Sequence, residues 1–260
     1  MKKFLLTALL FVSAVLAAKT INCEGTYTGH LQGIDSDGQF IYWSFTNTIV
    51  KTDMDGKIVK KVKATSHSGD PCLLNGKLYV PVNKGAFNQP KGKSKDFIHV
   101  YNAETLEFIK EVATPEYDHG AGAIAAWNGH LWLTGGLPDG APGNIIIEYT
   151  EELEFVKRHD SAGFTRMGIQ TMKHMFGYWW YGVYDKPANV LCDDKFVIVA
   201  RPSGPSLAIG MAELKDGTLL VAKTKSTPLE DNPKKKVWSG SIVTATFDAE
   251  EKKAIVVKKD

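Results

Sequence analysis

Tight turns recur along this 260-residue chain at nearly regular intervals. They are Asp37-Gly38, Asn75-Gly76, Asn128-Gly129, Phe176-Gly177 and Asp216-Gly217, and their glycines are spaced by 38, 53, 48 and 40 residues. Asp-Gly and Asn-Gly pairs, which form four of the five turns, are the strongest short-range signal for a β-hairpin. A strand rich in aromatic or β-branched residues follows each turn. The spacing therefore predicts about five similar β units.

Short runs of β-branched and aromatic residues recur throughout the chain, whereas helical periodicity is scarce. The predicted strands include residues 40–44, 77–80, 97–101, 130–133, 144–149, 178–181, 196–199, 218–221 and 241–244. A hydrophobic content of 43% with only 3 cysteines excludes simple disorder and a disulfide-stapled miniprotein. The pattern predicts an all-β fold.

Each of the first three units also ends in a second hairpin with a polar tip, as in KTDMDGKIVKKV and VYNAETLEFIKEV. In these patterns the chain resembles the β-propeller superfamily, although no single family is indicated. The resemblance implies one propeller over residues 18–260, made of about five four-stranded antiparallel blades. A six-bladed ring closed by residues 19–28 and a two-sheet sandwich are the alternatives.

The first residues, MKKFLLTALLFVSAVLAA, have the layout of a bacterial secretory signal. Removal of residues 1–17 would leave 29 basic and 29 acidic groups, so we expect a secreted or periplasmic protein with neither nucleic acid nor membrane as a partner. Export would permit disulfides. Among Cys23, Cys72 and Cys192 at most one internal pair can form, and the sequence does not indicate which.

In propellers the residues just before each inner strand crowd the central opening. Counting back from the turns places residues 30–33, 67–70, 119–122, 168–171 and 209–211 there, and three of these segments begin with histidine. The candidate ligand site at this mouth consists of His30, His67, Asp70, His119, Gln170 and Thr171. It predicts a small-molecule ligand, either anionic or polyhydroxylated.

A divalent metal held by His30, His67 and His119 is one cofactor that such a site would suit. Alternatively, these residues only satisfy backbone groups and channel waters. The leading functional hypothesis is a binding propeller. A hydrolase or lyase that uses the same histidines is the alternative, and a protein-interaction scaffold is the third.

Glycoside hydrolysis is disfavoured because only Asp70 supplies a carboxylate in the clear axial register. Two further features have open interpretations. Residues 83–96 form a polar, Lys-rich insertion that we expect to protrude. The Trp179-Trp180-Tyr181 run, with Tyr184, either packs between blades or forms a stacking platform.

Overall fold

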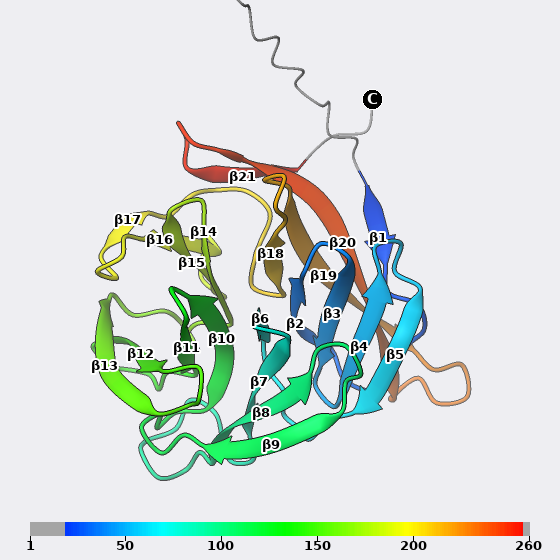
Figure 1. Cartoon of the computed structure of the whole chain (residues 1–260), viewed down its shortest axis with the longest axis horizontal. Helices are drawn as coiled ribbons and strands as arrows, with labels where there is room; N and C mark the ends of the chain where they lie inside the picture. Colours follow the sequence, from blue (N-terminus) through cyan, green and yellow to red (C-terminus); the bar gives the residue numbers. More distant parts are fainter. Residues whose placement is uncertain (1–18, 257–260) are drawn as a thin grey trace, which may run out of the picture.

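The computed structural model describes residues 19–256, and these form five antiparallel sheets arranged around a central axis (Figure 1). The chain is a five-bladed β-propeller. Within residues 19–256 there is no helix that could span a membrane. The predicted signal segment, residues 1–17, lies outside the described residues.

Four blades are continuous in sequence, and each runs from an inner to an outer strand. The first contains β2 (Leu31–Ser36), β3 (Phe40–Phe45), β4 (Thr48–Asp53) and β5 (Ile58–Lys63). The second contains β6 (Cys72–Leu74), β7 (Lys77–Asn83), β8 (Asp96–Asn102) and β9 (Phe108–Ala113). The third contains β10 (Ala121–Trp127), β11 (His130–Gly135), β12 (Gly143–Tyr149) and β13 (Phe155–Ala162). The fourth contains β14 (Thr171–Met175), β15 (Tyr178–Gly182), β16 (Asn189–Cys192) and β17 (Ile198–Ala200).

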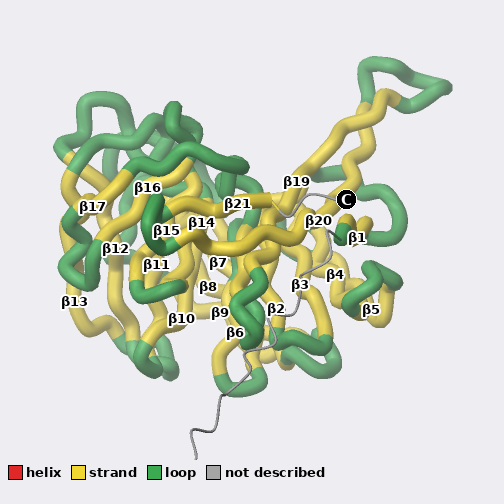
Figure 2. The backbone as a smooth tube through the Cα atoms, turned by 90° about the horizontal axis from the view of Figure 1, so that it is seen from above, coloured by secondary structure: helices red, strands yellow, loops and turns green. Residues whose placement is uncertain are grey.

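The fifth blade joins both ends of the described chain. It contains β18 (Met211–Glu213), β19 (Leu219–Pro228) and β20 (Lys236–Asp248), and β20 pairs on its outer side with both β1 (Thr20–Asn22) and β21 (Lys253–Val256). The N-terminal segment thus completes a fifth blade, and the six-bladed alternative is wrong. Beyond the ring, β19 and β20 continue as a protruding hairpin (Figure 2).

The predicted turns join the first two strands of each blade and define one face of the ring, which we call the turn face. Asn75 and Gly76 both have positive φ, 46° and 75°, as a type I′ hairpin requires. Phe176 adopts the same conformation, with φ 53°, although it is not a typical turn residue. One predicted strand begins late, because Phe196 is a positive-φ turn residue (φ 61°) and β17 starts only at Ile198.

The inner strands approach one another closely at the axis. The Asp70 amide donates to the Gly122 carbonyl at 2.8 Å, and the Ile124 amide donates to the Asp70 carbonyl at 3.0 Å, so that blades two and three are joined by backbone hydrogen bonds. A Cβ atom on Gly69 would lie 2.1 Å from the Gly122 oxygen. Glycine is therefore required at this position by contact with the neighbouring backbone.

Apolar clusters fill the spaces between the blades. Trp179 and Tyr181 pack on blade three, whereas Trp180 packs on blade five, which follows the alternation of side chains along β15. This confirms packing between blades for the Trp179–Tyr181 run. The three cysteines are buried and free, and no disulfide forms.

Candidate functional site

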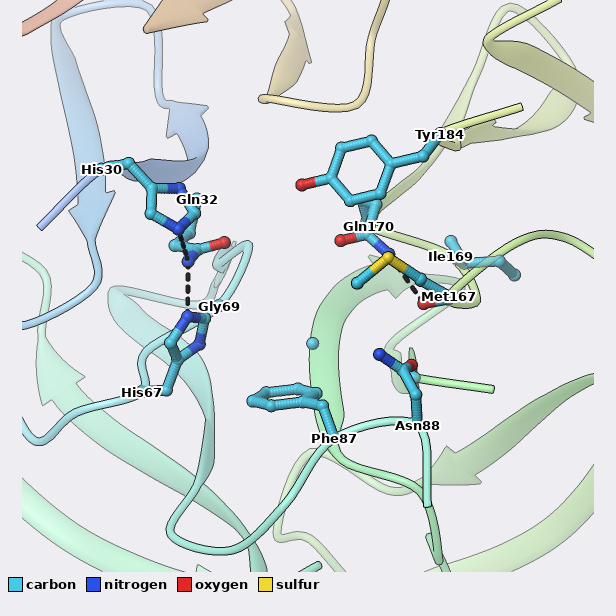
Figure 3. Close-up of a pocket in the computed structure, with 12 residues that line it drawn as sticks. His30, Gln32, His67, Gly69, Phe87, Asn88, Met167, Ile169, Gln170 and Tyr184 are labelled. Carbon is cyan, nitrogen blue, oxygen red and sulfur yellow. Dashed lines mark hydrogen bonds between the residues drawn. The ribbon is translucent and has the colours of Figure 1, made fainter. Parts of the chain in front are cut away.

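A cavity of about 190 Å³ opens where the inner strands begin, on the face opposite the turns; we call this the cavity face (Figure 3). It is lined by His30, Gln32, His67, Gly69, Phe87, Asn88, Gly122, Gly136, Met167, Ile169, Gln170 and Tyr184. Blades one to four supply these residues from segments before or at the start of their inner strands and from loops between their second and third strands.

One wall of the cavity is a pair of imidazoles joined by an amide. The Gln32 Nε2 atom lies 3.1 Å from His30 Nε2 and 2.7 Å from His67 Nε2. An amide NH₂ group has two hydrogens, so it can donate one to each ring. In this arrangement the Nε2 atom of each ring accepts a hydrogen bond, and His30 Nδ1 lies 3.3 Å from the Leu31 carbonyl.

The electrostatics of His67 agree with this arrangement. Burial lowers its pKa from 6.5 to about 4, and the neighbouring His30 ring lowers it too. Its Nδ1 atom is buried and has no hydrogen-bond partner among the described residues. The ring of Phe87 meets the ring of His67 edge-on, with 5.0 Å between centroids. The His67 part of this wall is therefore uncharged at neutral pH and, with Phe87, partly apolar.

The opposite wall comes from blade four. Tyr184 and Gln170 face the imidazole pair across the cavity, with Met167 and Ile169 beside them (Figure 3). The Gln170 side-chain amide donates to the Met167 carbonyl at 2.8 Å, which fixes its orientation. Burial raises the pKa of the Tyr184 hydroxyl, against an opposing effect of Arg166, so this group is protonated at neutral pH. This wall therefore combines neutral hydrogen-bonding groups, from Tyr184 and Gln170, with the apolar side chains of Met167 and Ile169.

The structure brings His30, His67 and Gln170 to the cavity but does not bring His119 there. The His119 side chain does not line the cavity, and its Nδ1 atom lies 2.9 Å from the Gln89 carbonyl. The position of His119 before its inner strand therefore predicts where its backbone lies, near the cavity, but not where its side chain lies.

Asp70 and Thr171 also lie near the axis without lining the cavity. Both side chains are fully buried. The Thr171 hydroxyl donates to the Leu207 carbonyl at 2.7 Å, and the Asp70 carboxylate accepts from the Met172 amide at 3.2 Å. Both residues join neighbouring segments of the ring, as the alternative structural interpretation expected.

The buried Asp70 carboxylate lies beside a buried cation. The buried Lys173 ammonium lies 4.0 Å from Asp70 and 3.6 Å from Asp35, and it donates to the Pro71 carbonyl. Burial nevertheless raises the pKa of Asp70 to about 8, and Lys173 opposes that rise. Burial likewise disfavours the Lys173 ammonium, but Asp35 and Asp70 raise its pKa overall.

The predicted three-histidine metal site does not form. Among residues 19–256, no group of three His, Cys, Asp or Glu side chains lies close enough together to hold a metal ion. The reason is the orientation of His119, which leaves only two imidazoles at the cavity, bridged by the amide of Gln32.

Six lining side chains lie outside the predicted site: Gln32, Phe87, Asn88, Met167, Ile169 and Tyr184. Gln32 lies inside the 30–33 segment and could have been found by its position. Phe87 and Asn88 come from the insertion that was expected to protrude, and nothing local in the sequence indicates that it reaches the cavity. Tyr184 follows the aromatic strand β15 and belongs to a loop instead.

No protein-family model and no curated protein sequence matches this chain. Among solved structures, it is similar to a xylan β-1,4-xylosidase from Bacillus halodurans C-125, with a TM-score of 0.60 and 12% identity over 91% of this chain and 56% of that chain. Weaker similarities include the RRP9 WD40 repeats (TM-score 0.46, 8% identity, 78% of this chain and 60% of that chain). BamB from Moraxella catarrhalis gives a TM-score of 0.40 and 10% identity, over 80% of this chain and 59% of that chain.

The likeness to the xylosidase is one of fold alone, since only 12% of the aligned residues are identical. This chain also spans little more than half of the xylosidase's length. The activity of that enzyme therefore says nothing by itself about the cavity described here.

Proposed function

We propose that this propeller binds an uncharged, polyhydroxylated small molecule, a sugar-like ligand, in the cavity between the imidazole pair and Tyr184. The observation that carries the proposal is the composition of the walls. Neutral donors and acceptors face each other across the cavity, and none of the described lining residues is Lys, Arg, Asp or Glu. Such a site can satisfy hydroxyl groups, which both donate and accept hydrogen bonds.

An anionic ligand fits this cavity less well. Anion sites in proteins use Arg, Lys or clustered backbone amides to compensate the charge. Among the described lining residues, only His30 and His67 can become cationic, and burial lowers the pKa of His67 to about 4. An anion beside His67 would therefore be desolvated without a counter-charge from that ring, which is unfavourable. Of the two ligand classes considered from the sequence, the uncharged one is supported.

The size of the cavity favours a single ring. A volume of about 190 Å³ is somewhat larger than the engineered cavity of about 150 Å³ that accommodates benzene. A pyranose has hydroxyl groups around its edge and C–H groups on its faces, which suits polar walls combined with Phe87, Met167 and Ile169.

Binding without turnover is the simpler form of the proposal. Most glycosidases need two carboxylates on opposite sides of the scissile bond, and the described cavity walls contain none. Asp70 is directed into the ring, where it accepts from the Met172 amide. A histidine-based hydrolase or lyase is the second candidate, supported by the two imidazoles that the Gln32 bridge holds side by side at the cavity.

Export is part of the same proposal. The layout of residues 1–17 supports secretion to the periplasm or outside the cell. A binding protein for a small, uncharged nutrient or signal would meet its ligand there.

The test is titration of the purified protein with neutral and anionic sugars. We expect methyl β-D-glucopyranoside and methyl β-D-xylopyranoside to bind, and D-glucuronate to bind at least about ten-fold more weakly because its carboxylate lacks a counter-charge. Tyr184→Phe should weaken neutral-sugar binding about five-fold through loss of one hydrogen bond. Tyr178→Phe, at the turn-face end of β15, is the matched control.

Tighter binding of D-glucuronate than of the neutral sugars would contradict the proposal, as would binding unaffected by Tyr184→Phe. Proton NMR of the same mixtures separates the two candidates. Unchanged ligand after prolonged incubation indicates binding alone, whereas new product signals indicate an enzyme.

A further inference from the structure

The insertion in blade two is held firmly at its base rather than protruding freely. We call residues 84–95 the strap. The side-chain oxygen of Asn83 accepts from the Gly85 amide at 2.7 Å and from the Lys95 amide at 3.0 Å. Across the strap, the Ala86 amide donates to the Lys93 carbonyl at 2.9 Å. The two arms are therefore paired, and their common direction is set by a single buried side chain.

The tip of the strap is attached to blade three on the far side of the cavity mouth. The Asn88 amide donates to the His119 carbonyl at 3.0 Å, and the Asn88 side-chain oxygen accepts from the Leu137 amide at 2.9 Å. The His119 ring adds the contact from Nδ1 to the Gln89 carbonyl at 2.9 Å. The strap thus bridges two blades, and His119 fixes its tip.

Two glycines of blade three leave room for this tip. A Cβ atom on Gly120 would lie 2.3 Å from Cδ1 of Phe87, and one on Gly136 would lie 2.8 Å from the Asn88 side-chain oxygen. Gly120 also has a φ of 104°, which other residues rarely adopt. The Phe87 ring can therefore occupy its position beside His67 only because residue 120 has no side chain.

We infer that Phe87 is the specificity-determining residue of the cavity, and that His119 and Gly120 are positioning residues acting through it. The inference rests on the proposed function. Phe87 is the only aromatic hydrocarbon ring among the described lining residues, and it stands beside the hydrogen-bonding groups of His67 and Asn88 (Figure 3). It selects ligands that present a flat C–H face as well as hydroxyl groups, that is, cyclic sugars over open-chain polyols.

The selectivity is tested with two probes of similar hydroxyl chemistry, methyl β-D-xylopyranoside and the open-chain polyol xylitol. We expect Phe87→Ala to weaken binding of the cyclic probe about five- to ten-fold, the usual size of one aromatic contact, and to change xylitol binding less than about two-fold. Phe108→Ala is the matched control, because this residue is 54% exposed on β9 and does not line the cavity.

The outcomes separate the inference from the proposed function. Equal losses for both probes, or no loss for either, would overturn the inference while leaving sugar binding intact. Failure of the wild-type protein to bind any neutral sugar would overturn the proposed function, and the inference with it.

The positioning role of His119 has its own readout. His119→Ala removes one hydrogen bond to the strap, so amide exchange at residues 86–89 should accelerate about five-fold while the unfolding midpoint stays nearly constant. The same variant should lose part of the preference for the cyclic probe. His119→Gln, which retains a donor, should restore some of both. Unchanged exchange in His119→Ala would show that the ring does not position the strap.

Discussion

The Gln32 bridge makes the charge state of the imidazole pair predictable. In the wild-type protein His67 has a pKa of about 4 in place of 6.5, because it is buried and lies next to His30. Gln32→Glu keeps the shape of the side chain and places a carboxylate at the position that now lies 2.7 Å from His67 Nε2. An opposite charge at such a distance raises a histidine pKa by about one to three units. We therefore expect His67 to titrate between about 5 and 7 in the variant.

The same substitution changes how stability depends on pH. Between pH 6.5 and 4 the unfolded wild-type chain binds a proton at His67 that the folded protein does not, so stability falls as the pH falls through this window. The full difference of 2.5 units corresponds to about 3 kcal/mol as an upper value. In Gln32→Glu the folded pKa approaches the unfolded one, so the His67 contribution to this loss should shrink to about 2 kcal/mol or less.

The assay is an NMR titration of the histidine Cε1–H signals, with the His67 signal assigned from its absence in His67→Gln. Gln170→Glu is the matched control, because Gln170 hydrogen-bonds to backbone carbonyls on the opposite wall and to neither imidazole. It should shift His67 by less than about half a unit. A wild-type His67 that titrates near 6.5, or an equal shift in both variants, would falsify the account of this wall.

Three further predictions concern the axis of the ring. Gly69→Ala should destabilise the protein by more than about 3 kcal/mol in urea unfolding, because its Cβ would lie 2.1 Å from a backbone oxygen. The control Gly76→Ala, at an open turn with φ 75°, should cost only about 1 kcal/mol. Similar costs for the two variants would contradict the packing argument. Lys173→Met should destabilise the protein more at pH 9 than at pH 6, by up to about 3 to 5 kcal/mol, because Asp70 is an ionised carboxylate that needs the buried cation only above its pKa of about 8; a loss independent of pH would refute this. Because the pKa of Asp70 is about 8, the folded protein holds a proton that the unfolded chain releases above pH 3.8. The contribution of Asp70 to stability therefore falls as the pH rises from about 4 to 8. Asp70→Asn should remove this part of the pH dependence, as measured by urea unfolding at several pH values.

The fold could be predicted because its signals are local and repeated. Turns such as Asn75-Gly76 require positive φ at both residues, and few sequences other than Asn-Gly provide it without strain. Their spacing then fixes the number of units. The closure of the ring could not be fixed in the same way, because the pairing of β1 with β20 joins residues more than two hundred positions apart.

The site could be predicted only in part, since register gives the position of a backbone segment but not the direction of each side chain. His30 and His119 occupy equivalent places before their inner strands, yet one lines the cavity and the other binds the strap. The difference arises from the insertion in blade two, which brings the Gln89 carbonyl within reach of His119. Long-range contacts of this kind have no signature in either segment alone.

The position of Asp70 limits the chemistry open to the cavity. It was the one carboxylate that the sequence placed in the axial register, and hydrolytic mechanisms that need an acid would depend on it. Its carboxylate instead accepts from the backbone of blade four and lies beneath Gly33, where a Cβ atom would be 2.1 Å from the Asp70 oxygen. This carboxylate is fully buried and does not line the cavity. Among the described lining residues, the imidazoles and the Tyr184 hydroxyl are the groups that can transfer a proton, and the substitutions at Gln32 and Tyr184 test both.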